Sequence, residues 1–315
     1  MNPLFYFIHM TTPAKRHFPQ FRFRDGSKWL FNPVLKKRFA NRPEERVRLR
    51  FVDYLLSETD FNKNRIGFEA PIKLPEAENT LRADLVLYNR SMKPFALIEC
   101  KSENIKLTYK TAEQVTRYNR RLNAEYLMMT NGNEEIWYNI GEQITVLVKS
   151  PLDQNKIGSE NAGSAAYWVD RGFISANSTE KTKRLALEIL QPFRQESGSD
   201  RVQYLDLPST LAPFPLGHYY HISTIEPECK MGISILDNGS DSTILCGVLN
   251  RAGKNQGIIW ATLDNLAASS GEEATVISPS GRRTIELPAT FSRELMNKDE
   301  RFLKNLGGQL LLFFD

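Results

Sequence analysis

The feature that most constrains the fold is a continuously apolar run, Phe95-Ala96-Leu97-Ile98, which passes directly into Glu99-Cys100-Lys101. An apolar run of this length is typical of a central strand that is buried on both faces of a sheet. At 315 residues the chain is long enough for two domains, so a core that buries such a strand is readily built. Charged residues at the end of a buried strand are costly unless they are paired or used, and they therefore mark a candidate site.

The residues around this run predict an α/β domain with a mixed sheet. Pro43 opens a helix whose buried stripe is Val47, Phe51, Tyr54 and Leu55. Three strands are expected next, as an antiparallel meander, over residues 68–74, 81–88 and 95–101. Thr111-Ala-Glu-Gln114 has the pattern of a capping box and predicts a helix to about Leu122. Strands over 126–130 and 135–140 follow, and the first of them should run parallel to the central strand. Pro13, Pro19 and Pro33 interrupt residues 1–40, which are expected to be irregular.

The second half of the chain has a different pattern, which predicts a separate β-rich domain. We place the first domain at 1–150, a polar linker at 151–165 and the second domain at 166–315. Helices are expected near residues 181–195 and 292–306. Short strands separated by turn residues are expected at 219–224, 231–236, 243–249, 257–262, 274–277, 284–287 and 309–314.

Charge is distributed unevenly between the two halves. Residues 1–150 hold 25 Lys and Arg against 17 Asp and Glu, whereas the rest of the chain holds 16 against 20. A basic half of this kind favours a polyanionic partner. Three cysteines without paired spacing (Cys100, Cys229 and Cys246) and the lack of a long apolar segment predict a cytoplasmic protein that does not enter the membrane.

Asp84, Glu99 and Lys101 are the residues most suited to chemistry. Strand alternation places Glu99 and Lys101 on one face and Cys100 on the other, and a short hairpin brings Asp84 beside Glu99. Two carboxylates with one lysine leave a net negative pocket that suits Mg²⁺, which would stabilise charge on a phosphate and activate a bound water. Lys101 would orient or help to deprotonate this water and offset negative charge. Ordinary salt bridging of the three residues is the alternative.

Two helices could complete this site. Gln114 and Tyr118 share a helix face, with Arg117 and Arg121 beside them. Glu44 or Glu45 could add a carboxylate from the first helix; Glu44 is favoured because it borders the buried stripe, while Glu45 is expected on a more exposed face. Gln114 as a capping partner, Tyr118 as a core aromatic and the arginines as a solvated face are the alternatives.

In the second domain, His218 and His221 are three residues apart on a predicted strand. This spacing directs the two rings to opposite faces, so we do not predict a metal site there.

These motifs resemble those of the PD-(D/E)xK nuclease superfamily, in the branch that has a Q-x-x-x-Y helix. The closer resemblance is to the N-terminal nuclease domain of type I restriction R subunits and its stand-alone relatives. It covers roughly residues 40–140 and rests on five segments: Pro-Glu-Glu-Arg-Val-Arg (43–48), Arg-Ala-Asp-Leu-Val-Leu-Tyr (82–88), Leu-Ile-Glu-Cys-Lys (97–101), Gln-Val-Thr-Arg-Tyr-Asn (114–119) and Thr-Asn-Gly (130–132).

The resemblance implies a restriction endonuclease-like fold and Mg²⁺-dependent cleavage of DNA, with Mn²⁺ as a substitute. It implies Asp84 and Glu99 as metal ligands and Lys101 as the catalytic lysine. Cys100 is expected to pack into the core, although its backbone carbonyl is a further candidate ligand. Arg48, Arg117 and Arg121 are candidate contacts to DNA.

The sequence departs from the family at two points. Ala83 replaces the proline of the superfamily's name, which leaves the carboxylate of Asp84 in place. The ATP-binding pattern of the R-subunit motor is absent from the sequence, so ATP-dependent translocation is not implied.

Several functions remain open on the sequence alone. We expect a DNA endonuclease of restriction, phage defence or repair. The main alternative is a catalytically inactive nucleic-acid-binding or assembly module with the same fold, and an RNA nuclease is a third possibility. A homodimer, or a partner protein bound through residues 166–315, would fit the expected function.

Overall fold

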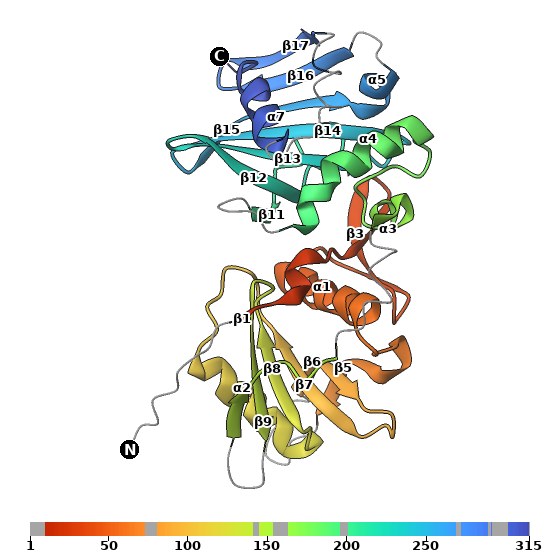
Figure 1. Cartoon of the computed structure of the whole chain (residues 1–315), viewed down its shortest axis with the longest axis vertical. Helices are drawn as coiled ribbons and strands as arrows, with labels where there is room; N and C mark the ends of the chain where they lie inside the picture. The colour runs from red at the N-terminus through yellow and green to blue at the C-terminus, as the bar shows by residue number, and fades with distance from the viewer. Residues whose placement is uncertain are drawn as a thin grey trace. The chain divides into compact units, whose positions relative to one another are not determined.

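The computed structural model describes residues 10–72, 81–140, 145–153, 163–195, 201–268, 272–288, 291 and 302–314. The chain divides into two compact units, of which residues 1–20 and 29–160 form the first and residues 21–28 and 161–315 form the second. Figure 1 shows the helices and strands of both units. Among the described residues, no helix is long and apolar enough to cross a membrane.

The first unit is built on a mixed sheet with the strand order β1-β9-β8-β7-β6-β5, in which β10 also pairs with β9. Strands β5, β6 and β7 form an antiparallel meander, and β7 pairs in parallel with β8 across the helix α2 (Tyr109–Leu122). The predicted mixed sheet and its parallel pair are therefore confirmed. The strands are β1 (Met10–Thr11), β5 (Ile66–Ile72), β6 (Leu81–Tyr88), β7 (Pro94–Cys100), β8 (Tyr126–Thr130), β9 (Glu134–Ile140) and β10 (Thr145–Val148).

Helices cover both faces of this sheet. Helix α1 (Pro43–Glu58) buries the predicted stripe against alternate residues of β7, namely Ala96, Ile98 and Cys100. On the other face, Val115 of α2 packs with Leu97. Strand β7 is thus buried on both sides, as its continuous apolar run predicts, and its last residues are held at a fixed point between two helices.

Two local predictions for the first unit are wrong. Helix α2 begins after Thr108, whose side chain forms no capping hydrogen bond, so Thr111 lies inside the helix and does not cap it. Residues 10–40 are also more regular than expected. Pro13 opens the 3₁₀ helix η1 (Pro13–Arg16), and the strands that follow avoid all three prolines: β2 (Gln20–Arg24), β3 (Ser27–Asn32) and β4 (Lys37–Phe39). Residues 73 and 74 of the predicted strand 68–74 lie outside the described residues.

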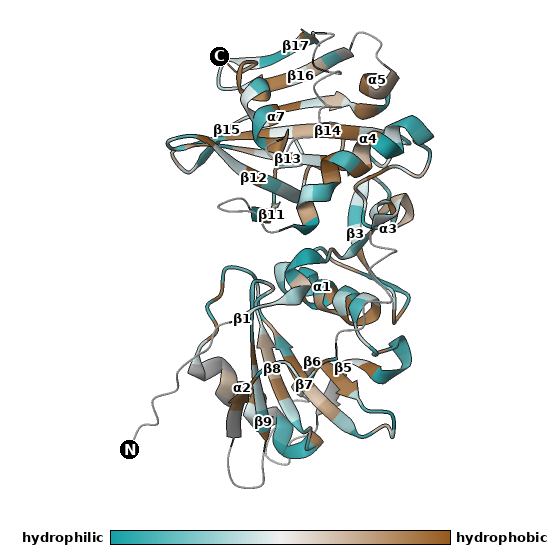
Figure 2. Ribbon diagram, viewed as in Figure 1, coloured by the Kyte–Doolittle hydropathy of each residue, from teal (hydrophilic) through white to brown (hydrophobic). Residues whose placement is uncertain are grey.

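The second unit is β-rich, as predicted. Its sheet is an antiparallel meander of seven strands in sequence order. The strands are β11 (Arg201–Leu205), β12 (His218–Glu226), β13 (Cys229–Asp237), β14 (Thr243–Arg251), β15 (Lys254–Thr262), β16 (Glu272–Ser278) and β17 (Gly281–Leu287). The helices are α3 (Ala165–Asp170), α4 (Glu180–Leu190), η5 (Gln191–Arg194), α5 (Leu263–Ala268) and α7 (Phe302–Leu311). Figure 2 shows that α4 carries both hydrophilic and hydrophobic residues. Its hydrophobic residues Leu185, Ile189 and Leu190 are buried.

The predicted strand at 309–314 is wrong, because this segment is the end of α7 followed by a turn. Leu306 and Leu310 are buried by helical spacing. Gly307 lets the helix approach the sheet closely, since a Cβ at this position would lie 2.8 Å from Ile225 Cδ1. Packing therefore outweighs the β propensity of the terminal apolar residues. Most of the predicted helix at 292–306 lies outside the described residues, as do residues 154–162 of the predicted linker.

Residues 21–28 group with the second unit, whereas the sequence pattern placed all of residues 1–150 together. Arg22 forms an ion pair with Asp170 at 2.9 Å, and Lys28 Nζ lies 2.7 Å from His218 Nδ1. His221 instead lies 3.3 Å from the Ser223 hydroxyl, so the two histidines have different surroundings. These contacts join residues far apart in the sequence, and no local pattern predicts them.

Candidate active site

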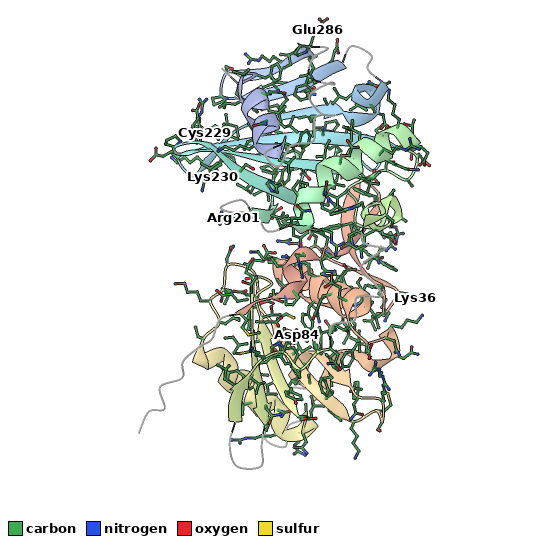
Figure 3. The ribbon with its side chains drawn as sticks, in the orientation of Figure 1. Lys36, Asp84, Arg201, Cys229, Lys230 and Glu286 are labelled. Atoms are coloured by element: carbon green, nitrogen blue, oxygen red, sulfur yellow. The ribbon has the colours of Figure 1, made fainter. Side chains whose placement is uncertain are left out.

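Asp84 and Glu99 face each other across neighbouring strands of the first unit. Leu85 of β6 pairs with Ile98 of β7, so the next step along this antiparallel ladder places Asp84 opposite Glu99. Asp84 Oδ2 accepts a hydrogen bond of 2.7 Å from the Cys100 backbone N–H. This bond fixes the Asp84 carboxylate at the end of β7, and Figure 3 shows its position in the first unit.

Lys101 lies directly beside Glu99. Its Nζ donates a 2.7 Å hydrogen bond to Glu99 Oε1, and its backbone N–H donates to the Thr130 carbonyl at 2.8 Å. The second bond continues the parallel pairing of β7 with β8, so the lysine backbone belongs to the rigid sheet. The Glu99 side chain is 7% exposed and the Lys101 side chain is 21% exposed.

The two carboxylates resist ionisation. Burial and then the nearby charge of Asp84 raise the pKa of Glu99 to about 7, although Lys101 acts in the opposite direction. Burial also raises the pKa of Asp84, and this effect is opposed by the Cys100 N–H and by the positive charges of Arg48 and Lys101. With all its carboxylates ionised, the site therefore holds more negative than positive charge, which is the electrostatic condition that favours a bound cation.

Lys101 stays protonated in this setting. Partial burial lowers its pKa, but the hydrogen bond to Glu99 and the charges of Glu99, Glu44 and Asp84 outweigh burial and raise it. An ammonium group cannot take a proton from water. The arrangement therefore favours charge stabilisation and water orientation over proton abstraction as the role of this lysine.

The exposure of the two glutamates on α1 is the reverse of our expectation. Glu45 is buried and forms an ion pair with Arg48, whereas Glu44 is exposed. The prediction failed because it considered only the apolar stripe, and a glutamate can be buried beside that stripe when an arginine one turn later neutralises it. Glu44 is nevertheless close enough for its charge to affect the pKa values of Asp84, Glu99 and Lys101.

Arg48 belongs to the interior of the site. Its Nη2 donates to Glu45, while its Nη1 lies 3.6 Å from Glu69 Oε1 and 3.8 Å from Asp84 Oδ1. The residue is 9% exposed. This placement does not support the predicted contact between Arg48 and DNA, since the guanidinium group is directed at three carboxylates.

Glu69 is a residue of this site that the sequence reasoning missed. Phe68 pairs with Leu85 and Ala70 pairs with Ala83, so Glu69 stands opposite Asp84. Glu69, Asp84 and Glu99 thus form one row across β5, β6 and β7. The sequence signal that could have identified Glu69 is its position inside the predicted strand 68–74, where antiparallel pairing places it opposite Asp84.

The Q-x-x-x-Y motif lies on α2, as predicted, but the side chains of Gln114, Arg117 and Tyr118 lie outside the described part of the chain. Arg121, near the end of the same helix, is exposed. Because Val115 packs on Leu97, and Leu97 and Glu99 share a face of β7, α2 covers the sheet face that carries Glu99.

Cys100 points away from Glu99, as predicted, and is buried in the cluster under α1. Burial and, to a lesser extent, the charge of Asp84 hold the pKa of its thiol well above the usual range. The side chain is therefore a neutral packing group. Its backbone N–H is the functional part of the residue, because this group orients Asp84.

The Thr-Asn-Gly motif forms the turn between β8 and β9. The Asn131 side chain accepts from the backbone N–H groups of Asn133 and Glu134 and donates to the Ile105 carbonyl. It therefore links this turn to the loop that follows Lys101. Gly132 has φ +82°, and a Cβ there would lie 3.0 Å from Val47 Cγ2.

Residues 43–150 match the family of the type I restriction enzyme R protein N terminus. The matched segment begins at the first residue of α1 and contains every residue of the candidate site. It covers less than half of the chain and excludes the second unit. No curated protein matches the chain, and no solved structure matches it.

The residues present fit a hard divalent cation. Asp84 and Glu99 provide two carboxylates whose pKa values are raised, and one buried oxygen of Glu45 (Oε1) lacks a hydrogen-bond partner among the described residues. Within the same residues, no three His, Cys, Asp or Glu side chains gather closely enough to enclose a metal ion. This donor set suits Mg²⁺, which commonly binds through one or two carboxylates and keeps several waters.

Proposed function

We propose that this chain is a Mg²⁺-dependent deoxyribonuclease that hydrolyses phosphodiester bonds in restriction, phage defence or repair. The observation that carries the proposal is the convergence of Asp84, Glu99 and Lys101 at the end of β7. The match of residues 43–150 to the restriction R protein N terminus supports a restriction nuclease in particular.

Asp84 and Glu99 would hold the cation, and Mn²⁺ should substitute for Mg²⁺. When bound, the cation supplies a Lewis acid and a water of lowered pKa. Lys101, kept protonated by Glu99, donates hydrogen bonds toward the attacking water and toward the negative charge that develops on the phosphate. The exposed Arg121 would contact the DNA backbone, together with Arg117.

Cleavage of supercoiled plasmid, linear duplex, single-stranded DNA and RNA in Mg²⁺, Mn²⁺ or EDTA tests this proposal. We expect the wild-type chain to cut DNA only with a divalent cation. Lys101→Ala should lower the rate by at least about a hundredfold, because it removes a charge that acts on the transition state. Asp84→Asn should also abolish cleavage, while its retained amide oxygen still accepts from Cys100.

DNA binding separates the nuclease from the inactive binding module. In EDTA, both variants should bind DNA as tightly as the wild-type chain does. Glu273→Gln, a substitution of an exposed residue, is the control variant and should behave as the wild-type chain. Binding without cleavage by the wild-type chain on every substrate would favour the inactive module. Light scattering of the same samples tests the proposed homodimer, in which two sites would cut both strands.

A further inference from the structure

The backbone at Glu69 is unusual for a residue inside a strand. Its φ is +45°, in the left-handed region that favours glycine. The other described non-glycine residues with positive φ lie in turns or cap a helix. A strained conformation persists only where its surroundings require it, and such strain clusters at functional sites.

The side chain of Glu69 is directed at Arg48, and Arg48 is shared. Its Nη2 is committed to Glu45, whereas Nη1 lies 3.6 Å from Glu69 and 3.8 Å from Asp84. Both distances are too long for a hydrogen bond. Nη1 therefore lies between two carboxylates of the same row without a hydrogen bond to either. Both contacts are ion pairs through the same nitrogen, and a shift toward Asp84 would add a hydrogen bond to its pair with that carboxylate.

That hydrogen-bonded ion pair would compete with a cation. Asp84 Oδ2 already uses one lone pair on the Cys100 N–H, and Oδ1 is the oxygen that lies 3.8 Å from Arg48. A guanidinium group hydrogen-bonded to this oxygen would neutralise it and block its approach to a metal. Glu45 and Glu69 together give the guanidinium two other carboxylates.

We propose that Glu69 is a positioning residue, which together with Glu45 keeps Arg48 from hydrogen-bonding to Asp84 and so keeps Asp84 available to a divalent cation. The inference rests on the proposed function, because it concerns the same cation. It assigns Glu69 no contact with substrate. The strained backbone is the means by which a strand residue directs its carboxylate toward α1.

The inference is tested by measuring Mn²⁺ binding to the full chain in the absence of DNA. Electron paramagnetic resonance reports the concentration of free Mn²⁺. Glu69→Gln should weaken Mn²⁺ binding about tenfold or more, as is common when a partner of a metal ligand is lost. Glu69→Gly should weaken it similarly, while its melting temperature equals or exceeds that of the wild-type chain, because glycine relieves the positive φ. Glu286→Gln, an exposed strand glutamate of the second unit (Figure 3), is the matched control.

Removing the arginine distinguishes action through Arg48 from a direct effect of the Glu69 charge. In an Arg48→Gln background, Glu69→Gln should change the Mn²⁺ affinity less than twofold. If Arg48→Gln does not fold because it leaves Glu45 buried and unpaired, Arg48→Gln with Glu45→Gln removes both partners and provides the same background. A tenfold loss that persists without the arginine would overturn the inference.

The outcomes also separate this inference from the proposed function. Mn²⁺ binding that depends on Asp84 but is unchanged in Glu69→Gln would overturn the inference alone. A wild-type chain that binds no Mn²⁺, or one that binds it no more tightly than the Asp84→Asn variant does, would overturn both the inference and the proposed function.

Discussion

At the scale of single residues, the site holds more carboxylates than cationic side chains: Glu45, Glu69, Asp84 and Glu99 against Arg48 and Lys101. Glu99 illustrates this, because it is almost fully buried, faces Asp84 and accepts a hydrogen bond from the positively charged Lys101. Because its pKa is about 7, ionising this carboxyl at neutral pH lowers the stability of the folded protein when no cation is bound. The same property makes the residue a sensitive probe of the site.

Glu99→Gln should stabilise the cation-free protein at pH 8. The pKa of Glu99 rises from 4.5 to about 7 on folding, so between these values the folded state holds a proton that the unfolded state releases. The free energy of unfolding therefore falls as the pH rises through this window, by up to about 3 kcal/mol. Denaturant unfolding in EDTA should show a more stable variant at pH 8 and equal stabilities at pH 4. A gain of the same size at both pH values would contradict the assigned pKa.

At the scale of elements, the turn between β8 and β9 supports the end of β7. The Thr130 carbonyl accepts from the Lys101 N–H, and the Asn131 side chain ties the turn to the loop after Lys101. Gly132 lets this turn pass closely over Val47 of α1. The turn therefore joins the lysine strand, its neighbour and α1 into one rigid unit.

Gly132→Ala should destabilise the protein by about 2–3 kcal/mol, since it combines a positive φ with a close contact to Val47. Gly253→Ala is the matched control, because Gly253 has φ +79° but no atom within 4 Å of the added Cβ. The control should cost about 1 kcal/mol. Equal losses in urea unfolding of the two variants would show that the contact with Val47 has no energetic role.

At the scale of the whole molecule, the chain combines two units with separate cores, and the candidate site lies entirely in the first. The basic half of the sequence corresponds mainly to this unit, in keeping with a polyanionic substrate. The second unit has its own seven-stranded sheet, and a partner protein bound through residues 166–315 would fit the expected function.

Mg²⁺ should therefore stabilise one unit and leave the other unchanged. Calorimetry of the full chain should resolve two unfolding transitions, of which one rises with Mg²⁺ concentration, by about 2.7 kcal/mol at a hundred times the dissociation constant. Asp84→Asn should abolish this rise without moving the second transition. Two transitions that rise together, or a rise that Asp84→Asn retains, would be inconsistent with a cation site confined to the first unit.

The sequence by itself determined the presence of α1, α2 and strands β5 to β9 in the first unit, and the pairing of Asp84 with Glu99. Strand and helix periodicity are local, and a short antiparallel hairpin leaves few registers in which its apolar residues can be buried. The same local reasoning predicted a β-rich second unit, and it failed at residues 309–314, where packing against the sheet favours a helix.

Only the tertiary structure decided which charges are buried and where residues 21–28 belong. The burial of Glu45, the central place of Arg48 and the strained backbone of Glu69 all depend on how α1 meets the carboxylates of β5 and β6. The cost of burying a charge depends on partners that are distant in sequence, and sequence periodicity contains no information about them.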